Sequence, residues 1–252
     1  MAADFFNDPS RRDILRLAGG AAALIALGAS PLAALAQTGS GGGPLKIATI
    51  GSGREGGALG TLFAKAGHPV MFSSRHPENL KQMVSDLGPL ARAGTPAEAA
   101  AFGDVLLIAV PYGALPQVGR DLGSALNGKV VLDACNAVAA RDGDIANQVR
   151  DKGIGVVSAS LLPGARVVRA FNTLGARILA TEAHRSGEPL AIPIAGDDQA
   201  AVQIAAGLVR DAGLEPVVVG GLAKASEFQQ GARGYGQQVG ARELKQKLDL
   251  PQ

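Results

Sequence analysis

The sequence contains no tryptophan, one cysteine, three histidines and only 4% aromatic residues. A lone cysteine, Cys135, excludes both an intramolecular disulfide and a zinc site built on several cysteines. The three histidines, His68, His76 and His184, lack the spacing of metal ligands. A formal net charge of +2, with no basic run, argues against a nucleic-acid partner. No Ser/His/Asp or Cys/His set for nucleophilic catalysis stands out either.

The first 36 residues differ in composition from the rest of the chain. Ser10-Arg11-Arg12-Asp13-Ile14-Leu15 matches a twin-arginine export signal, and an apolar stretch continues to Leu35. Ala34-Leu35-Ala36 offers a cleavage site, and residues 37–44 resemble a flexible Gly/Ser linker. We therefore expect residues 1–36 to be a twin-arginine signal peptide, with the export machinery as a partner and a periplasmic or exported location. The alternative is an uncleaved N-terminal anchor or a disordered segment.

Beyond the linker, apolar runs alternate with helical segments. Asp104 to Val110 is a continuous apolar run typical of a strand buried on both faces, and Lys129 to Ala134 predicts another strand. Thr95-Pro96-Ala97-Glu98 predicts a helix start with a capping box. The alternation predicts an α/β protein with a Rossmann-type, doubly wound, mainly parallel sheet and helices on both faces. We expect this domain to span residues 45–222, followed by a C-terminal tail with a short helix at 223–252.

A glycine turn lies at the start of this domain. Ile47 to Ile50 predicts a strand, and glycines follow at 51, 53 and 56 with G-x-G-x-x-G spacing. In that pattern one glycine makes the tight turn, one lets the backbone approach a pyrophosphate, and one lets the helix pack on the strand. We expect a pyrophosphate to bind here; the alternative is a glycine-rich turn without a ligand. The predicted binding residues of the turn are Gly51, Ser52, Gly53, Arg54, Glu55 and Gly56.

The end of the second predicted strand suggests which dinucleotide binds. Val70, Met71 and Phe72 are followed by Ser73-Ser74-Arg75, where an NAD-preferring unit usually carries an acid for the ribose 2′-OH. Two hydroxyls and a guanidinium suit a 2′-phosphate instead. The sequence therefore predicts NADP(H) as the cofactor. The alternative interpretation of Arg75 is a solvated surface arginine. Lys81 is a weaker candidate for the same phosphate.

Three further segments end predicted strands and should face the same crevice, because ligands bind beyond the carboxyl ends of such strands. They are Val110-Pro111-Tyr112, Asn136 after Asp133, and Asn172-Thr173. For Tyr112 the alternatives are a hydrogen bond to a substrate and packing on the cofactor. Cys135 is expected to be a small packed residue, and Asp133 a structural residue at a strand end.

Together these residues resemble the family of NADP oxidoreductases that use the deazaflavin coenzyme F-420. The likeness covers about residues 45 to 222. The motifs that carry it are Ile50-Gly51-Ser52-Gly53, Ser74-Arg75, Ala109-Val110-Pro111, Asp133-Ala134-Cys135-Asn136, Leu162-Pro163-Gly164-Ala165, Arg169-Ala170-Phe171-Asn172-Thr173 and Ile194-Ala195-Gly196-Asp197-Asp198.

The resemblance implies roles for several of these residues. Ser74 and Arg75 hold the 2′-phosphate, Val110-Pro111 packs near the nicotinamide, and Asn136 and Asn172 line the crevice for a second ring. The sequence departs from the family pattern at Ala137, where a proline is common. It also departs at Asn79, where the family has a basic residue.

The predicted activity is hydride transfer between NADP(H) and a deazaflavin or flavin-like acceptor, a small-molecule redox substrate. This chemistry needs positioned rings rather than a protein nucleophile, so no catalytic residue is assigned. Two alternatives remain open: an exported NADP-binding module without catalysis, and a small imine or ketone reductase. The sequence leaves the oligomeric state open, a homodimer included.

Overall fold

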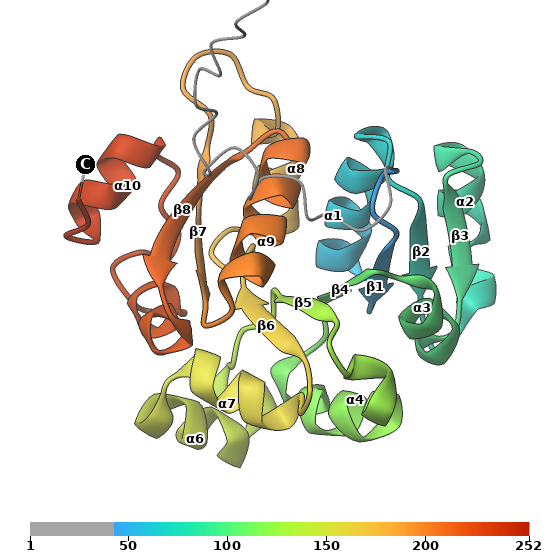
Figure 1. Cartoon of the computed structure of the whole chain (residues 1–252), viewed down its shortest axis with the longest axis horizontal. Coiled ribbons are helices and arrows are strands. Elements are labelled where there is room, and N and C mark those ends of the chain that lie inside the picture. Colours follow the sequence, from blue (N-terminus) through green and yellow to red (C-terminus); the bar gives the residue numbers. More distant parts are fainter. Residues whose placement is uncertain (1–42, 252) are drawn as a thin grey trace, which may run out of the picture. The chain divides into compact units, whose positions relative to one another are not determined.

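An eight-stranded sheet organises residues 43–251, the part of the chain that the computed structural model describes. The predicted signal peptide and nearly all of the predicted linker lie outside these residues. The strand order is β3-β2-β1-β4-β5-β6-β7-β8 (Figure 1). The strands are β1 (Ile47–Ile50), β2 (Val70–Ser73), β3 (Ala91–Gly94), β4 (Val105–Ile108), β5 (Val130–Asp133), β6 (Arg166–Arg169), β7 (Ala191–Gly196) and β8 (Glu215–Gly220).

The first six strands are parallel, and only the β6–β7 pairing is antiparallel. β7 and β8 are parallel to each other and run against the rest of the sheet. The predicted mainly parallel, doubly wound fold is therefore confirmed. As a consequence, the carboxyl ends of β1 to β6 share one edge, and the segment after β7 that contains Asp197 and Asp198 lies at the opposite edge.

Helices cover both faces of the sheet because the central strands are apolar on both sides. Every residue of β1, β4 and β5 is buried, which is typical of parallel strands enclosed by helices. One core contains residues of α1, α8 and α9, and a second contains residues of α3, α4 and α7. The α-helices are α1 (Arg54–Lys65), α2 (Lys81–Leu87), α3 (Pro96–Phe102), α4 (Leu115–Leu122), α5 (Ala139–Asp142), α6 (Asp144–Lys152), α7 (Ile154–Leu161), α8 (Ala176–Glu182), α9 (Gln199–Asp211) and α10 (Ala241–Lys247).

The predicted capping box is confirmed at the start of α3. The Thr95 hydroxyl accepts the Glu98 backbone N–H, and the Glu98 carboxylate accepts the Thr95 N–H at 2.7 Å. The sequence interpretation missed β3 and the helices α5, α7 and α8. β3 is a short edge strand, and α7 reads as an apolar run with β-branched residues, which does not distinguish a buried helix from a strand.

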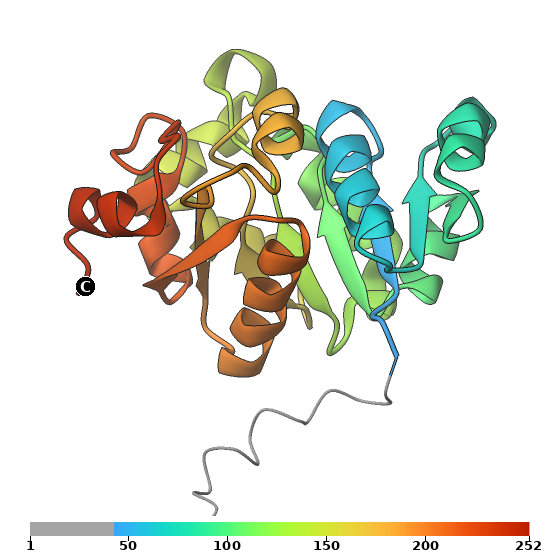
Figure 2. The same ribbon diagram turned by 90° about the horizontal axis from the view of Figure 1, so that it is seen from above.

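The C-terminal residues belong to the same compact unit as the sheet. Phe228, Leu244 and Leu248 are buried in the core that also contains Val217 of β8. Figure 2 shows α10, in red, at the β8 end of the sheet, far from α1. The predicted short helix is present as α10, but the boundary expected at residue 222 cuts through a continuous core.

Candidate functional site

The three glycines after β1 differ in their surroundings, and each difference has a physical reason. Gly51 has a φ of +91°, a conformation that favours glycine. A Cβ at Gly56 would stand 2.0 Å from the Gly51 carbonyl oxygen, so the helix α1 could not pack there with a side chain. Around Gly53 no such atom lies within 4 Å of the Cβ position. The turn therefore packs tightly at Gly51 and Gly56 and leaves open space above Gly53.

A cavity of about 550 Å³ opens beside this turn, within the range of small-molecule sites. It brings together most of the predicted cofactor residues at the carboxyl ends of β1, β2 and β4. Its other wall comes from α3 and α4. The predicted residues that line it are Gly51, Ser52, Gly53, Ser73, Ser74, Arg75, Val110 and Pro111.

The Ser-Ser-Arg segment at the end of β2 presents only two of its three side chains to a ligand. The buried Ser73 hydroxyl donates to the Thr49 carbonyl of β1 at 2.6 Å. The Ser74 oxygen accepts the His76 backbone N–H at 3.0 Å and keeps its own proton for another acceptor. Arg75 is exposed and is the only basic residue among those that line the cavity. Ser74 and Arg75 therefore remain available to a phosphate.

The α4 wall of the cavity was missed from the sequence. Gln117, Val118 and Asp121 line it, and the Gln117 amide donates to Asp121 at 2.5 Å. Asp121 is the one acid in the lining, so it offsets the charge of Arg75 across the cavity. The one sequence signal for this wall was the four-residue spacing of Gln117 and Asp121, which places them on the same face of a helix. Lys81 does not line the cavity.

Arg54 and Glu55 are not part of this cavity. They line a second one, of about 510 Å³, together with the start of α8. Burial raises the pKa of Glu55 above its ordinary value, while the Ala176 backbone N–H and the nearby Arg54 oppose the shift. The six predicted residues of the glycine turn thus separate into a part that faces the first cavity, a packing residue at Gly56, and a part that faces the second cavity.

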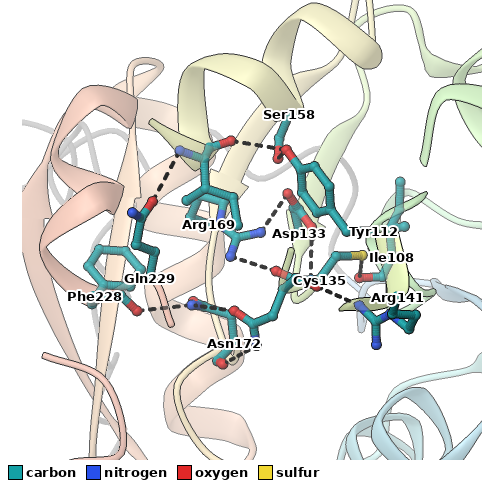
Figure 3. A network of polar contacts seen from close by, with 12 residues as sticks. Ile108, Tyr112, Asp133, Cys135, Arg141, Ser158, Arg169, Asn172, Phe228 and Gln229 are labelled. Atoms are coloured by element: carbon teal, nitrogen blue, oxygen red, sulfur yellow. Dashed lines mark hydrogen bonds and ion pairs between the residues drawn. The ribbon is translucent and has the colours of Figure 1, made fainter. Parts of the chain in front are cut away.

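Asn136 lies outside both cavities and is hydrogen-bonded to Asn172. The Asn136 amide donates to the Asn172 carbonyl at 2.6 Å. The Asn172 amide donates to the Phe228 carbonyl at 3.1 Å (Figure 3). Between β6 and Asn172, Phe171 has a φ of +63°, which is rare for an aromatic residue. Its ring packs edge-on against Phe63, with the centroids 6.0 Å apart. This strained residue turns the chain so that the two asparagines meet.

A buried ion pair supports the Asn136 segment from below. Arg169 Nη1 lies 2.7 Å from Asp133 Oδ2, and both side chains are fully buried. The other Arg169 nitrogen Nη2 donates to the Cys135 carbonyl at 2.7 Å, and Asp133 accepts the Cys135 N–H at 2.9 Å. The pair thereby clamps the backbone between Asp133 and Asn136 (Figure 3). Asp133 is structural, as predicted, and its partner Arg169 was not identified as such.

Cys135 and Tyr112 both point into the core rather than into the crevice. Burial raises the pKa of the Cys135 thiol well above its ordinary value, and the residue is packed, as predicted. Tyr112 is fully buried, and its hydroxyl lies 3.0 Å from that of Ser158. Burial also raises the pKa of Tyr112. Both interpretations of Tyr112, as a hydrogen-bond donor to a substrate and as packing on the cofactor, are wrong.

Two properties of the described part of the chain concern metals and membranes. Within residues 43–251 no cluster of three or more His, Cys, Asp and Glu side chains could hold a metal ion. Over the same range no helix combines the length and apolar character needed to cross a bilayer.

Comparison with known proteins adds a family and a relative. Residues 46–137 match the family described as NADP oxidoreductase coenzyme F420-dependent. An F420-dependent NADP reductase from Methanothermobacter thermautotrophicus is 29% identical over 197 residues, which cover 72% of this chain and 83% of the relative. The family match and this relative indicate an NADP-dependent oxidoreductase.

Solved structures support the fold. A hypothetical protein from Sinorhizobium meliloti has a TM-score of 0.66 at 27% identity, and the match covers 78% of this chain and 95% of that one. The 3-hydroxyisobutyrate dehydrogenase of Mycobacterium tuberculosis has a TM-score of 0.53 at 18% identity. That match covers 73% of this chain and 58% of the longer dehydrogenase.

Proposed function

We propose that this protein transfers a hydride between NADP(H) and a deazaflavin or flavin-like acceptor. The observation that carries the cofactor half of the proposal is the cavity beside the glycine turn, with Ser74 and Arg75 at one end and Val110 and Pro111 at another. The family match and the archaeal relative support the acceptor half.

The residues of the cavity fit an extended dinucleotide. The open space above Gly53 admits a pyrophosphate at the N-terminus of α1, where no side chain caps the helix. Ser74 and Arg75 would hold the 2′-phosphate, one by a neutral hydroxyl and the other by a charged guanidinium. Bound NADP(H) would supply the hydride at its nicotinamide ring, near Val110 and Pro111.

The chain's contribution to such a reaction is positioning. Hydride transfer needs the two carbons within about 3–3.5 Å, aligned and shielded from water. Val110 and Pro111 provide an apolar wall, and the Asn136–Asn172 pair provides a rigid polar one. Asn172 Oδ1 is buried without a hydrogen-bond partner in the described residues. Such atoms are uncommon, and a ligand or water often completes them at a functional site.

Turnover is the test of this proposal. The purified full chain is mixed with NADPH and, in separate reactions, with coenzyme F-420, FMN and a cyclic imine, and NADPH oxidation is followed by absorbance. We expect oxidation with F-420 or FMN and none with the imine. Tight NADPH binding without turnover of any acceptor would instead identify a binding module, and turnover of the imine alone would identify an imine reductase.

We further propose that the protein is exported through the twin-arginine pathway, on the strength of the Arg11-Arg12 motif and the apolar stretch after it. Residues 1–44 fused to a reporter should be found outside the cytoplasm. An Arg11→Lys, Arg12→Lys variant of the same fusion is the matched control and should stay inside. Retention of both fusions in the cytoplasm would contradict the proposal.

A further inference from the structure

The second cavity is lined by two arginines, Arg54 and Arg177. Arg54 lies at the start of α1 and Arg177 at the start of α8, and both are exposed. Neither forms an ion pair within 4 Å among the residues that the structure describes. Most other cavities of this size are lined mainly by apolar groups with a few placed polar ones. Two guanidinium groups without an ion pair in the described residues line this cavity, so we expect an anionic ligand to bind there.

The rest of the lining sets the size and character of what binds there. Gly175, Ala176 and Ile178 form a small, mostly apolar floor, and the volume is about 510 Å³. Glu55 is the one acid in the lining; it is half-buried, it accepts a hydrogen bond from the Ala176 backbone N–H, and the nearby Arg54 opposes the rise that burial causes in its pKa. The lining thus carries two positive charges and one negative charge, and it keeps a net positive charge when Glu55 is ionised.

The position of this cavity separates it from the cofactor cavity. α1 and α8 contribute to one core and cover one face of the sheet, whereas α3 and α4, which line the first cavity, cover the other. The two cavities therefore flank the glycine turn on opposite faces. Asn172 lies close to the second cavity, because only two residues separate it from Gly175, which lines that cavity.

We propose that the second cavity binds the phosphate of a flavin-type acceptor whose ring lies against Asn136 and Asn172. This inference rests on the proposed function and adds to it a requirement for an anionic group on the acceptor. The cavity's guanidinium groups hold the phosphate, Arg177 from α8 and Arg54 from α1. Arg177 belongs to no motif of the cofactor site, so it distinguishes acceptor binding from cofactor binding.

The test compares ligands that share a ring and differ by one phosphate. FMN is paired with riboflavin, and 5-deaza-FMN with 5-deazariboflavin, and binding to the full chain saturated with NADP⁺ is measured by fluorescence. The wild-type chain should bind the phosphate-bearing member of at least one pair about tenfold more tightly, as expected for a charge-assisted hydrogen bond worth roughly 1.4 kcal/mol. Arg177→Gln should remove that preference while leaving the affinity for the phosphate-free member and for NADPH unchanged.

Two further variants sharpen the test. Glu55→Gln removes the only acid of the cavity and should strengthen binding of the phosphate-bearing ligand. Arg210→Gln, at an exposed arginine near the end of α9, is the matched control and should change nothing.

The outcomes separate the inference from the proposed function. Equal binding of both members of each pair by the wild-type chain would overturn the inference and leave hydride transfer to a neutral acceptor standing. Weaker NADPH binding by Arg177→Gln would also overturn it, since the cavity would then belong to the cofactor. If neither pair binds, the inference fails, and NADPH turnover with the other acceptors still decides the proposed function.

Discussion

The carboxyl edge of the sheet has two halves that differ in how their polar groups are satisfied. At the ends of β1, β2 and β4, glycines, the Ser74 hydroxyl and the exposed Arg75 surround a cavity. At the ends of β5 and β6, polar groups bond to one another: the buried Asp133 pairs with Arg169, and the Asn136 amide donates to the Asn172 carbonyl. The first half is arranged for a ligand, and the second half holds its own shape without one.

The difference shows where rigidity and openness are needed in one crevice. Hydride transfer requires a fixed distance between two rings. A buried network on one side gives a wall that does not move, and an open turn on the other side admits the cofactor. If this comparison is right, substitutions in the network should act on stability first, and substitutions around the cavity should act on binding first.

The largest effect is expected at the buried ion pair. Arg169→Leu should lower the free energy of unfolding by about 3–5 kcal/mol, because it leaves the Asp133 carboxylate buried without its counter-ion. Denaturant unfolding of the full chain measures this loss. The double variant Asp133→Leu, Arg169→Leu should recover part of the stability, since no unpaired charge remains. A loss below about 1 kcal/mol in the single variant would show that the pair does not clamp the 133–136 segment.

The next largest effect should distinguish two glycines of the same turn, one needed for packing and the other for binding. Gly56→Ala should destabilise the fold by about 1–3 kcal/mol, because its Cβ would collide with the Gly51 carbonyl. Gly53→Ala should leave the unfolding midpoint unchanged, since its φ of −71° suits any residue and its surroundings are open. The same Gly53 variant should bind NADPH roughly tenfold more weakly, about 1.4 kcal/mol, if the pyrophosphate lies there. Calorimetry and a fluorescence titration test the two variants, and identical behaviour of both would remove the distinction between packing and binding glycines.

A smaller effect is expected on the reactivity of Cys135, the one cysteine of the sequence. Thiolate is the reactive form, and every unit by which the pKa of Cys135 is raised lowers the thiolate fraction about tenfold at neutral pH. Alkylation of the native chain should therefore be at least about tenfold slower than alkylation of the unfolded chain at pH 8. Its rate should also keep rising about tenfold per pH unit from pH 7 to pH 9, whereas the rate for the unfolded chain should begin to level off, because burial raises the pKa of the Cys135 thiol. Rapid native alkylation would mean that the network opens readily.

The sequence predicted the first half of the edge far better than the second. Gly51, Gly53 and Gly56 have backbone requirements that are local, so their spacing alone indicates a turn, a helix and an anion site. Tyr112 was misassigned because nothing local shows whether a tyrosine after a strand faces the crevice or the core. Its partner Ser158 is 46 residues away in the chain.

The same limit explains the other omissions. The Asp133–Arg169 pair forms because β5 and β6 are neighbours in parallel register, with Asp133 opposite Arg169. The two residues belong to separate sequence motifs, and neither motif indicates that they pair. The division of the glycine turn between two cavities depends on the way α8 packs against α1, and α8 itself was not predicted. Contacts that depend on which elements become neighbours were thus beyond the sequence, while contacts within one turn were not.

The most direct test of the central claim, that the cavity beside the glycine turn is an NADP(H) site, is the affinity of the full chain for NADPH and for NADH, measured by fluorescence for the wild type and for Arg75→Ala. We predict that the wild-type chain prefers NADPH by about tenfold or more, from a charge-assisted contact to the 2′-phosphate worth roughly 1.5 kcal/mol or above. We predict that Arg75→Ala loses most of this preference through weaker NADPH binding, with NADH affinity unchanged. Equal affinities for the two cofactors in the wild type, or an unchanged NADPH affinity in Arg75→Ala, would contradict the account.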